Sequence, residues 1–162
     1  MFDEKTINAI KDFMVAHGQT ISVAESVTSG LLQSAFASAQ DASLFFQGGI
    51  SAYNVGQKAR HLNVEPIHAI SNNCVSEKVA EEMALHVCLM FHSDWGISVT
   101  GYAAPVPQSN NELFAYYAIC YKNKILKKGK IKTKDKHPLD VKLVYINEII
   151  DGLYSIIKLQ ST

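Results

Sequence analysis

Apolar residues recur along this chain at two alternating spacings, one typical of helices and one typical of strands. Apolar positions three or four residues apart predict helices over five segments: 7–14, about 29–39, 57–62, 77–92 and 138–157. Short apolar or β-branched runs predict strands over five others: 20–24, 49–53, 95–100, 113–121 and 125–133. Because helices and strands alternate, we predict one α/β domain over residues 1–162, a three-layer α/β/α sandwich with a mixed sheet.

Capping and turn residues mark several boundaries of these elements. Ser76 is predicted to cap the helix that follows it, and either Thr28 or Ser29 to cap the second helix. Lys122-Asn123-Lys124 separates the last two strands and is typical of a hairpin turn. The loop 101–112 holds two prolines, and its length is typical of a functional loop.

Charge is balanced over the whole chain but not along it. Fifteen basic residues match fifteen acidic ones, which argues against a wholly basic nucleic-acid-binding protein. Residues 1–121 carry five basic and eleven acidic residues, whereas residues 122–162 carry ten and four. The lysines at every second position from 128 to 136 are predicted to share one face of an edge strand, where charge discourages pairing with another sheet.

Other features exclude several classes of protein. No apolar run approaches the roughly 18 residues that a membrane span needs, and the N-terminus lacks the pattern of a signal peptide. Cys74, Cys88 and Cys120 are far apart and form no Cys-x-x-Cys motif, which favours a cytoplasmic protein with reduced thiols. The histidines form no His-Glu-x-x-His motif. We therefore expect no metal, no cofactor, and no membrane or nucleic-acid partner.

Three stretches place polar side chains where strands are predicted to end, which is where ligands bind in α/β sheets. Residues 24–30 form a strand-to-helix turn rich in hydroxyls, which suits a phosphate or an oxyanion but equally suits simple N-capping. Tyr53 ends the next predicted strand, and Lys58 follows five residues later. A lysine acts as the base of a serine where burial lowers its pKa, and is otherwise a solvated charge. Thr100-Gly101 opens the proline-containing loop.

In their order and spacing, these stretches resemble the C-terminal domain of the competence/damage-inducible protein CinA. Residues 24–31 are similar to the family's Ala-Glu-Ser-Cys-Thr-Gly-Gly-Leu, and Gly49, Tyr53 and Lys58 keep the spacing of its next block. Val75-Ser76-Glu77 matches a Val-Ser-Glu helix start. Residues 99–105 match Val-Thr-Gly-Ile-Ala-Gly-Pro in part. The resemblance covers nearly the whole chain and implies a single domain of the CinA C-terminal type.

The stand-alone form of this family is a nicotinamide mononucleotide (NMN) deamidase, so the resemblance implies hydrolysis of the NMN carboxamide to nicotinate mononucleotide and ammonia. Ser26 would attack the amide carbon, and Lys58 and Tyr53 would transfer protons. Backbone N–H groups of residues 28–30 would bind the oxyanion, and the loop after Thr100 would hold the nucleotide. The residues expected to bind substrate are Thr28, Ser29, Gly30, Thr100, Gly101, Lys134 and Lys136.

The sequence departs from the family motifs mainly around this expected substrate site. Val27 replaces the motif's Cys, and Ser29 replaces the first Gly of the pair, where a side chain disfavours a positive φ. The loop reads Ala-Pro-Val-Pro-Gln over 104–108 in place of a glycine-rich run, and the family's arginine-containing segment before the last helix contains only lysines here. Lys134 or Lys136 would replace that arginine at a phosphate if it lay near the pocket.

Two functional classes therefore remain open. One is an amidohydrolase with an altered pocket, acting on NMN or a related pyridine amide. The other is a catalytically weakened or inactive paralogue that keeps the fold for nucleotide binding or assembly. In both cases we expect a small-molecule nucleotide as ligand and a homo-oligomer as the assembly. Tyr116, Tyr117 and Tyr121 lie on a predicted strand as material for sheet packing and for an interface.

Overall fold

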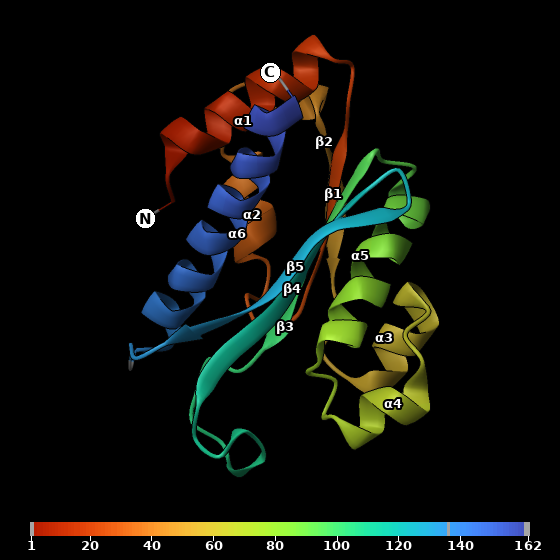
Figure 1. The fold of residues 1–162 in the computed structure, drawn as a ribbon, viewed down its shortest axis with the longest axis vertical. Helices are drawn as coiled ribbons and strands as arrows, with labels where there is room; N and C mark the ends of the chain where they lie inside the picture. The colour runs from red at the N-terminus through yellow and green to blue at the C-terminus, as the bar shows by residue number, and fades with distance from the viewer. Residues whose placement is uncertain (1, 136, 161–162) are drawn as a thin grey trace.

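A five-stranded mixed sheet with helices on both faces forms the body of the protein (Figure 1). The structure is a computed structural model that describes residues 2–135 and 137–160. The strands are β1 (Ile21–Glu25), β2 (Phe46–Ser51), β3 (Trp95–Gly101), β4 (Leu113–Tyr121) and β5 (Lys124–Thr133). Their order is β2-β1-β3-β4-β5; β1 is parallel to both neighbours, and β4 is antiparallel to β3 and β5. The predicted fold class is confirmed.

Helices form the two outer layers, with α1, α2 and α6 on one face of the sheet and α3, α4 and α5 on the other (Figure 1). They are α1 (Glu4–Ala16), α2 (Leu31–Ala37), α3 (Val55–Leu62), α4 (Pro66–Ser71), α5 (Glu77–Phe91) and α6 (Pro138–Gln160), with 3₁₀ turns η1 (Ala42–Leu44) and η2 (Pro107–Ser109). The sequence pattern did not predict α4, because six residues are too few to show a helical period. Among the described residues, no helix is long and apolar enough to cross a membrane.

The central strands β1 and β3 are buried on both faces. Ile21 and Val23 of β1 face the core under α1, α2 and α6, whereas Ala24 faces the core under α3 and α5. Helix α5 approaches the sheet so closely that a Cβ on Gly96 would lie 2.3 Å from the carbonyl oxygen of Ala84. Burial on both faces explains why these strands appear in the sequence as short apolar runs rather than as alternating patterns.

Strand β2 begins at Phe46, three residues before its predicted start. The pair Gly48-Gly49 obscures the strand pattern in the sequence, since glycine is depleted in strands. The structure requires glycine at position 49, because a Cβ there would lie 2.5 Å from the carbonyl oxygen of Val23 on β1. The close approach of β1 thus explains why β2 contains a glycine at position 49, although glycine weakens the strand pattern in the sequence.

The predicted caps have different outcomes. Ser76 caps α5 as predicted, since its Oγ accepts a hydrogen bond from the Val79 N–H at 3.2 Å. The predicted cap of α2 by Thr28 or Ser29 is wrong, because the N-cap residue is Gly30 and it provides no side-chain bond. The carboxylate of Glu25, at the end of β1, accepts from the first amides of α2 instead. The last residue of the preceding strand thus bonds the start of α2 in place of the predicted hydroxyl.

The hairpin and the edge strand are confirmed, but β5 ends at Thr133. Of the five alternating lysines, Lys128, Lys130 and Lys132 therefore lie on the strand, Lys134 follows it, and Lys136 lies outside the described residues. Lys122 and Asn123 have φ values of 46° and 62°, which is the conformation of a tight turn whose twist matches the flanking strands. Strand β5 lies at one edge of the sheet. The lysines of β5 were expected only to discourage pairing with another sheet, but Lys128 also forms ion pairs. Its Nζ lies 2.9 Å and 2.8 Å from the carboxylates of Glu77 and Glu81 on α5. The charges of β5 therefore also attach the edge of the sheet to a helix.

The expected packing role is confirmed for all three tyrosines. Tyr116 packs edge-on against Phe114, with ring centroids 5.9 Å apart, and against the buried cluster beneath α5. Tyr117 is buried in the core beneath α6. The ring of Tyr121 packs on that of Trp95, with centroids 4.5 Å apart. Cys88 of α5 is also buried, where its thiol packs as a small apolar side chain.

Candidate functional site

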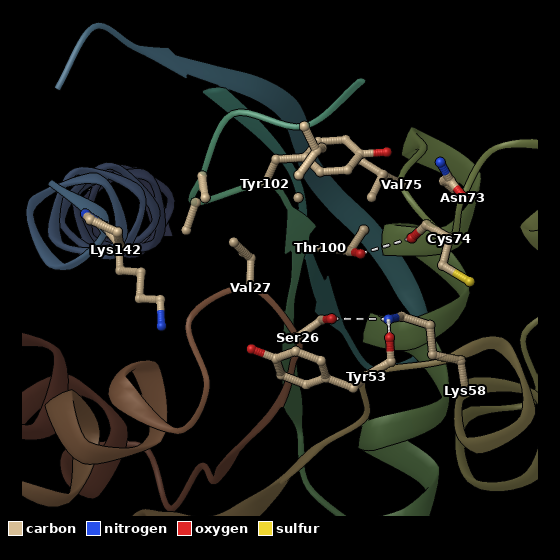
Figure 2. Close-up of a pocket in the computed structure, with 15 residues that line it drawn as sticks. Ser26, Val27, Tyr53, Lys58, Asn73, Cys74, Val75, Thr100, Tyr102 and Lys142 are labelled. Carbon is tan, nitrogen blue, oxygen red and sulfur yellow. Dashed lines mark hydrogen bonds between the residues drawn. The ribbon is translucent and has the colours of Figure 1, made fainter. Parts of the chain in front are cut away.

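A cavity of about 400 Å³ lies at the end of the sheet where β1 and β3 terminate (Figure 2). Ser26 follows β1, and Thr100 and Gly101 end β3, so the parallel course of the two strands places these residues at one edge. Tyr53 and Lys58 reach the same cavity from the segment after β2. The remaining lining residues are Val27, Asn73, Cys74, Val75, Tyr102, Ala103, Ala104, Val106, Pro138 and Lys142.

Ser26 and Lys58 form a buried pair. The Nζ atom of Lys58 lies 3.0 Å from Oγ of Ser26 and donates a second hydrogen bond to the carbonyl oxygen of Ala52 at 2.9 Å (Figure 2). Lys58 is 1% exposed, and in the described part of the chain none of the ion pairs involves it. Burial lowers the pKa of its amine below the ordinary value of 10.5. The lowered pKa favours a neutral Lys58 amine, which lies within hydrogen-bonding distance of the Ser26 hydroxyl.

Lys58 lies on the buried side of α3. Asn54 caps this helix by accepting a hydrogen bond from the Gln57 N–H at 3.0 Å. Lys58 and Leu62 lie four residues apart on one face, and both are buried. The local pattern left both a solvated charge and a buried base open for this lysine, and the resemblance implied the base. Because α3 packs against α5 and the loop after β2, the Lys58 side chain is buried.

Glu25 holds the turn that carries Ser26. Its buried carboxylate accepts from the N–H groups of Leu32 and Gln33, both at 3.1 Å, and from Nε2 of Gln33 at 2.9 Å. The Thr28 hydroxyl donates to the same carboxylate, and Thr28 is fully buried. The N-terminus of α2 therefore faces Glu25. None of Thr28, Ser29 and Gly30 lines the cavity, although the Ser29 hydroxyl bonds two side chains that do.

Ser29 and Tyr53 are joined at the mouth of the cavity. The Tyr53 hydroxyl lies 2.8 Å from Oγ of Ser29, and Lys142 of α6 donates to the same Oγ at 3.1 Å. Tyr53 is thus paired with Ser29 and not with Ser26, and its side chain is 66% exposed. Ser29 has a φ of 54°, so the expectation that a side chain disfavours this conformation is overcome here by the contacts of its hydroxyl.

Thr100 and Gly101 form the back wall of the cavity. The Thr100 hydroxyl donates to the carbonyl oxygen of Cys74 at 2.8 Å, which ties the end of β3 to the segment before α5 (Figure 2). A Cβ on Gly101 would lie 2.4 Å from the carbonyl oxygen of Phe114, so this position requires glycine. The following loop is also held, because the Tyr145 hydroxyl of α6 donates to the Tyr102 carbonyl at 2.8 Å.

The structure does not bring Lys134 to this cavity. Lys134 lines a separate hollow of about 720 Å³ together with Lys132, Thr133 and Asp135. Lys136 lies outside the described residues. The cation that reaches the site from the C-terminal part of the chain is Lys142, which the sequence pattern did not single out.

Lys142, Tyr102 and Cys74 all line the cavity without having been predicted. One signal was available for Tyr102, since it follows Thr100-Gly101 directly. The orientation of α6 decides the position of Lys142, and the α4–α5 turn decides that of Cys74. Among the described residues, no group of three or more histidine, cysteine, aspartate or glutamate side chains has the arrangement of a metal site.

The fold and the site define the class of protein. It is an α/β/α domain with a buried serine–lysine pair at the end of the sheet where the parallel strands β1 and β3 terminate. The CinA C-terminal domain family matches residues 3–138, and the chain belongs to this family. A "CinA-like protein" of Prochlorococcus marinus is 40% identical over 111 residues, which are 68% of this chain and 26% of that protein. A "putative competence-damage inducible protein" of Streptococcus pyogenes is 40% identical over 58% of this chain and 22% of its own length. The chain spans about a quarter of these relatives.

Solved structures show the same fold. A CinA superfamily protein of Escherichia coli superposes with a TM-score of 0.88 at 24% identity, covering 94% of this chain and 89% of that one. A competence or damage-inducible protein of Enterobacter asburiae superposes with a TM-score of 0.90 at 19% identity, covering 97% and 99%. These similarities extend over almost the whole domain, including α6, which lies mostly beyond the family match.

Proposed function

We propose that this domain is a serine–lysine amidohydrolase that deamidates NMN to nicotinate mononucleotide and ammonia. The observation that carries the proposal is the buried Lys58 amine, 3.0 Å from the Ser26 hydroxyl. A lysine with a lowered pKa and no carboxylate partner is what a serine nucleophile needs as its base. The choice of NMN as substrate follows the resemblance of the motifs to the stand-alone deamidases.

In the proposed reaction, Lys58 accepts the Ser26 proton while Oγ attacks the carboxamide carbon. The protonated Lys58 then donates to the amide nitrogen, the C–N bond breaks, and ammonia leaves an ester on Ser26. Water, deprotonated by Lys58, attacks that ester; the proton returns to Ser26 and the carboxylate product leaves. Each step moves one proton among Ser26, Lys58, the substrate and the attacking water, so water is the one further reactant that the scheme requires.

The oxyanion is assigned to the backbone N–H of Val27, the residue after the nucleophile. Of the amides at 28–30, that of Ser29 is already bonded inside the turn, to the carbonyl oxygen of Ser26 at 3.1 Å. Val27 lines the cavity beside Ser26. A donor from the residue after the nucleophile also serves the oxyanion in other serine hydrolases.

The charge of the cavity suits an anionic amide. Its described lining contains two lysines, Lys58 and Lys142, and no acidic residue. Because Lys58 is expected to work as a neutral amine, Lys142 supplies the positive charge. A nucleotide with a phosphate group matches this distribution.

A second candidate is a nucleotide-binding protein without turnover. It is favoured by the pairing of the Tyr53 hydroxyl with Ser29 and not with Ser26, and by the two prolines of the loop at 105 and 107. Prolines remove N–H donors that a loop would otherwise offer to a ligand. The two candidates differ in ammonia release and agree in nucleotide binding.

The test is ammonia release from NMN by the wild type and by Ser26→Ala, with Ser155→Ala, an exposed serine on α6, as the matched control. We expect turnover in the wild type and the control and its loss in Ser26→Ala. Absence of turnover in every protein, with NMN still raising the melting temperature, would establish the binding protein instead. Full turnover by Ser26→Ala would exclude Ser26 as the nucleophile.

A further inference from the structure

Three side chains from three separate elements meet at the mouth of the cavity. Ser29 precedes α2, Tyr53 follows β2, and Lys142 belongs to α6. Oγ of Ser29 lies 2.8 Å from the Tyr53 hydroxyl and 3.1 Å from Nζ of Lys142. Figure 2 shows the polar ends of Tyr53 and Lys142 on the same side of Ser26. We call these three residues the mouth cluster.

The ammonium of Lys142 has a neutral partner in this cluster. In the described part of the chain, no ion pair includes Lys142, and no aspartate or glutamate lines the cavity. Its hydrogen bond goes to a hydroxyl, which does not neutralise its charge. An ammonium that faces a cavity without a carboxylate is suited to an anionic group of a ligand.

Ser29 occupies a backbone conformation that costs a side-chain-bearing residue free energy. Its φ of 54° lies in the left-handed region, which costs an L-residue about 1–2 kcal/mol and glycine almost nothing. The hydroxyl compensates by bonding both Tyr53 and Lys142. A glycine at this position would relieve the backbone but would leave the other two side chains unconnected.

We propose that Ser29 is a specificity-determining residue that positions Lys142 and Tyr53 as a pair of donors for the phosphate monoester of the substrate. The ammonium and the phenol hydroxyl then donate to two oxygens of one phosphate, while the amide lies at Ser26. The pairing favours phosphorylated amides over neutral ones that share the same ring and sugar. This inference rests on the proposed function for the identity of the amide, but the cluster itself is tested by binding alone.

The experiment uses the Ser26→Ala protein, in which binding is separated from turnover. Calorimetry measures the dissociation constants of NMN and of nicotinamide riboside, which lacks the phosphate. Ser29→Gly and Lys142→Met are each added to this background, and Lys124→Met, an exposed lysine of the hairpin, serves as the control. Ser29→Gly suits the backbone at this position, so an unchanged melting temperature verifies that its fold is intact.

We expect Ser29→Gly and Lys142→Met each to raise the dissociation constant of NMN about tenfold, because each weakens a charge-assisted bond to phosphate. The dissociation constant of the riboside and the behaviour of Lys124→Met are expected to stay unchanged. Equal losses for NMN and the riboside, or no loss for either, would overturn the inference. So would a failure of the Ser26→Ala protein to bind NMN, whereas a failure to release ammonia by the wild type would refute only the proposed function.

Discussion

Replacing Lys58 with methionine isolates the contribution of one amine. Methionine has nearly the length of lysine and suits the buried position, so the change removes chiefly Nζ and its bonds to Ser26 at 3.0 Å and to the Ala52 carbonyl at 2.9 Å. General-base catalysis contributes about 10²- to 10⁴-fold to a rate, or about 3 to 5 kcal/mol of activation free energy. We expect kcat/KM for NMN to fall by a factor in that range.

The same substitution changes how stability depends on pH. Burial lowers the pKa of Lys58 in the folded protein below its ordinary value of 10.5. Between these two pKa values the unfolded state holds more protons, so the stability of the wild type rises with pH across that interval. Methionine does not titrate. The melting temperature of the wild type is therefore expected to increase relative to that of Lys58→Met as pH rises through this interval towards 10.5.

Opposing terms set the stability of Lys58→Met at neutral pH. The Ala52 carbonyl loses a donor, which costs about 1 to 3 kcal/mol, while the cost of burying an amine disappears. Ammonia release and thermal melting between pH 6 and 10 are measured for wild type, Lys58→Met and the exposed control Lys124→Met. Turnover by Lys58→Met within tenfold of the wild type, or parallel melting curves at all pH values, would refute the role given to this lysine.

Three further predictions concern the residues that hold the site. Glu25→Ala removes the carboxylate that caps α2 and is expected to lower the free energy of unfolding by about 3 to 5 kcal/mol, measured in urea. Gly101→Ala forces a Cβ to within 2.4 Å of a β4 carbonyl and should cost about 1 to 3 kcal/mol, whereas Gly56→Ala, with 3.4 Å of clearance on α3, should not destabilise; equal effects would contradict the geometry. Tyr145→Phe removes the bond to the Tyr102 carbonyl, which should cost about 1 kcal/mol and raise KM for NMN more than it lowers kcat; an unchanged KM would disprove the link between α6 and the loop.

Local chemistry in the sequence determined the elements and the identity of the central residues. The helical period predicted α5 and α6, the turn residues predicted the hairpin, and the motifs around Ser26 and Lys58 indicated the family. These signals depend on residues close together in the chain, so they are readable without a fold. The short helix α4 was missed because six residues are too few to show a helical period, and β2 was misplaced because Gly48-Gly49 weaken its strand signal.

Tertiary structure alone decided the state of the polar groups. Lysine is a residue type that usually lies at the surface, and the packing of α3 removes Lys58 from water and lowers its pKa. Glu25 replaced the expected hydroxyl cap because the end of β1 points at the start of α2. Lys142, and not Lys134, reaches the cavity because of how α6 lies across the sheet. Burial and distance arise from segments far apart in the sequence, and they set the charge and the reactivity of groups whose identity the sequence already contains.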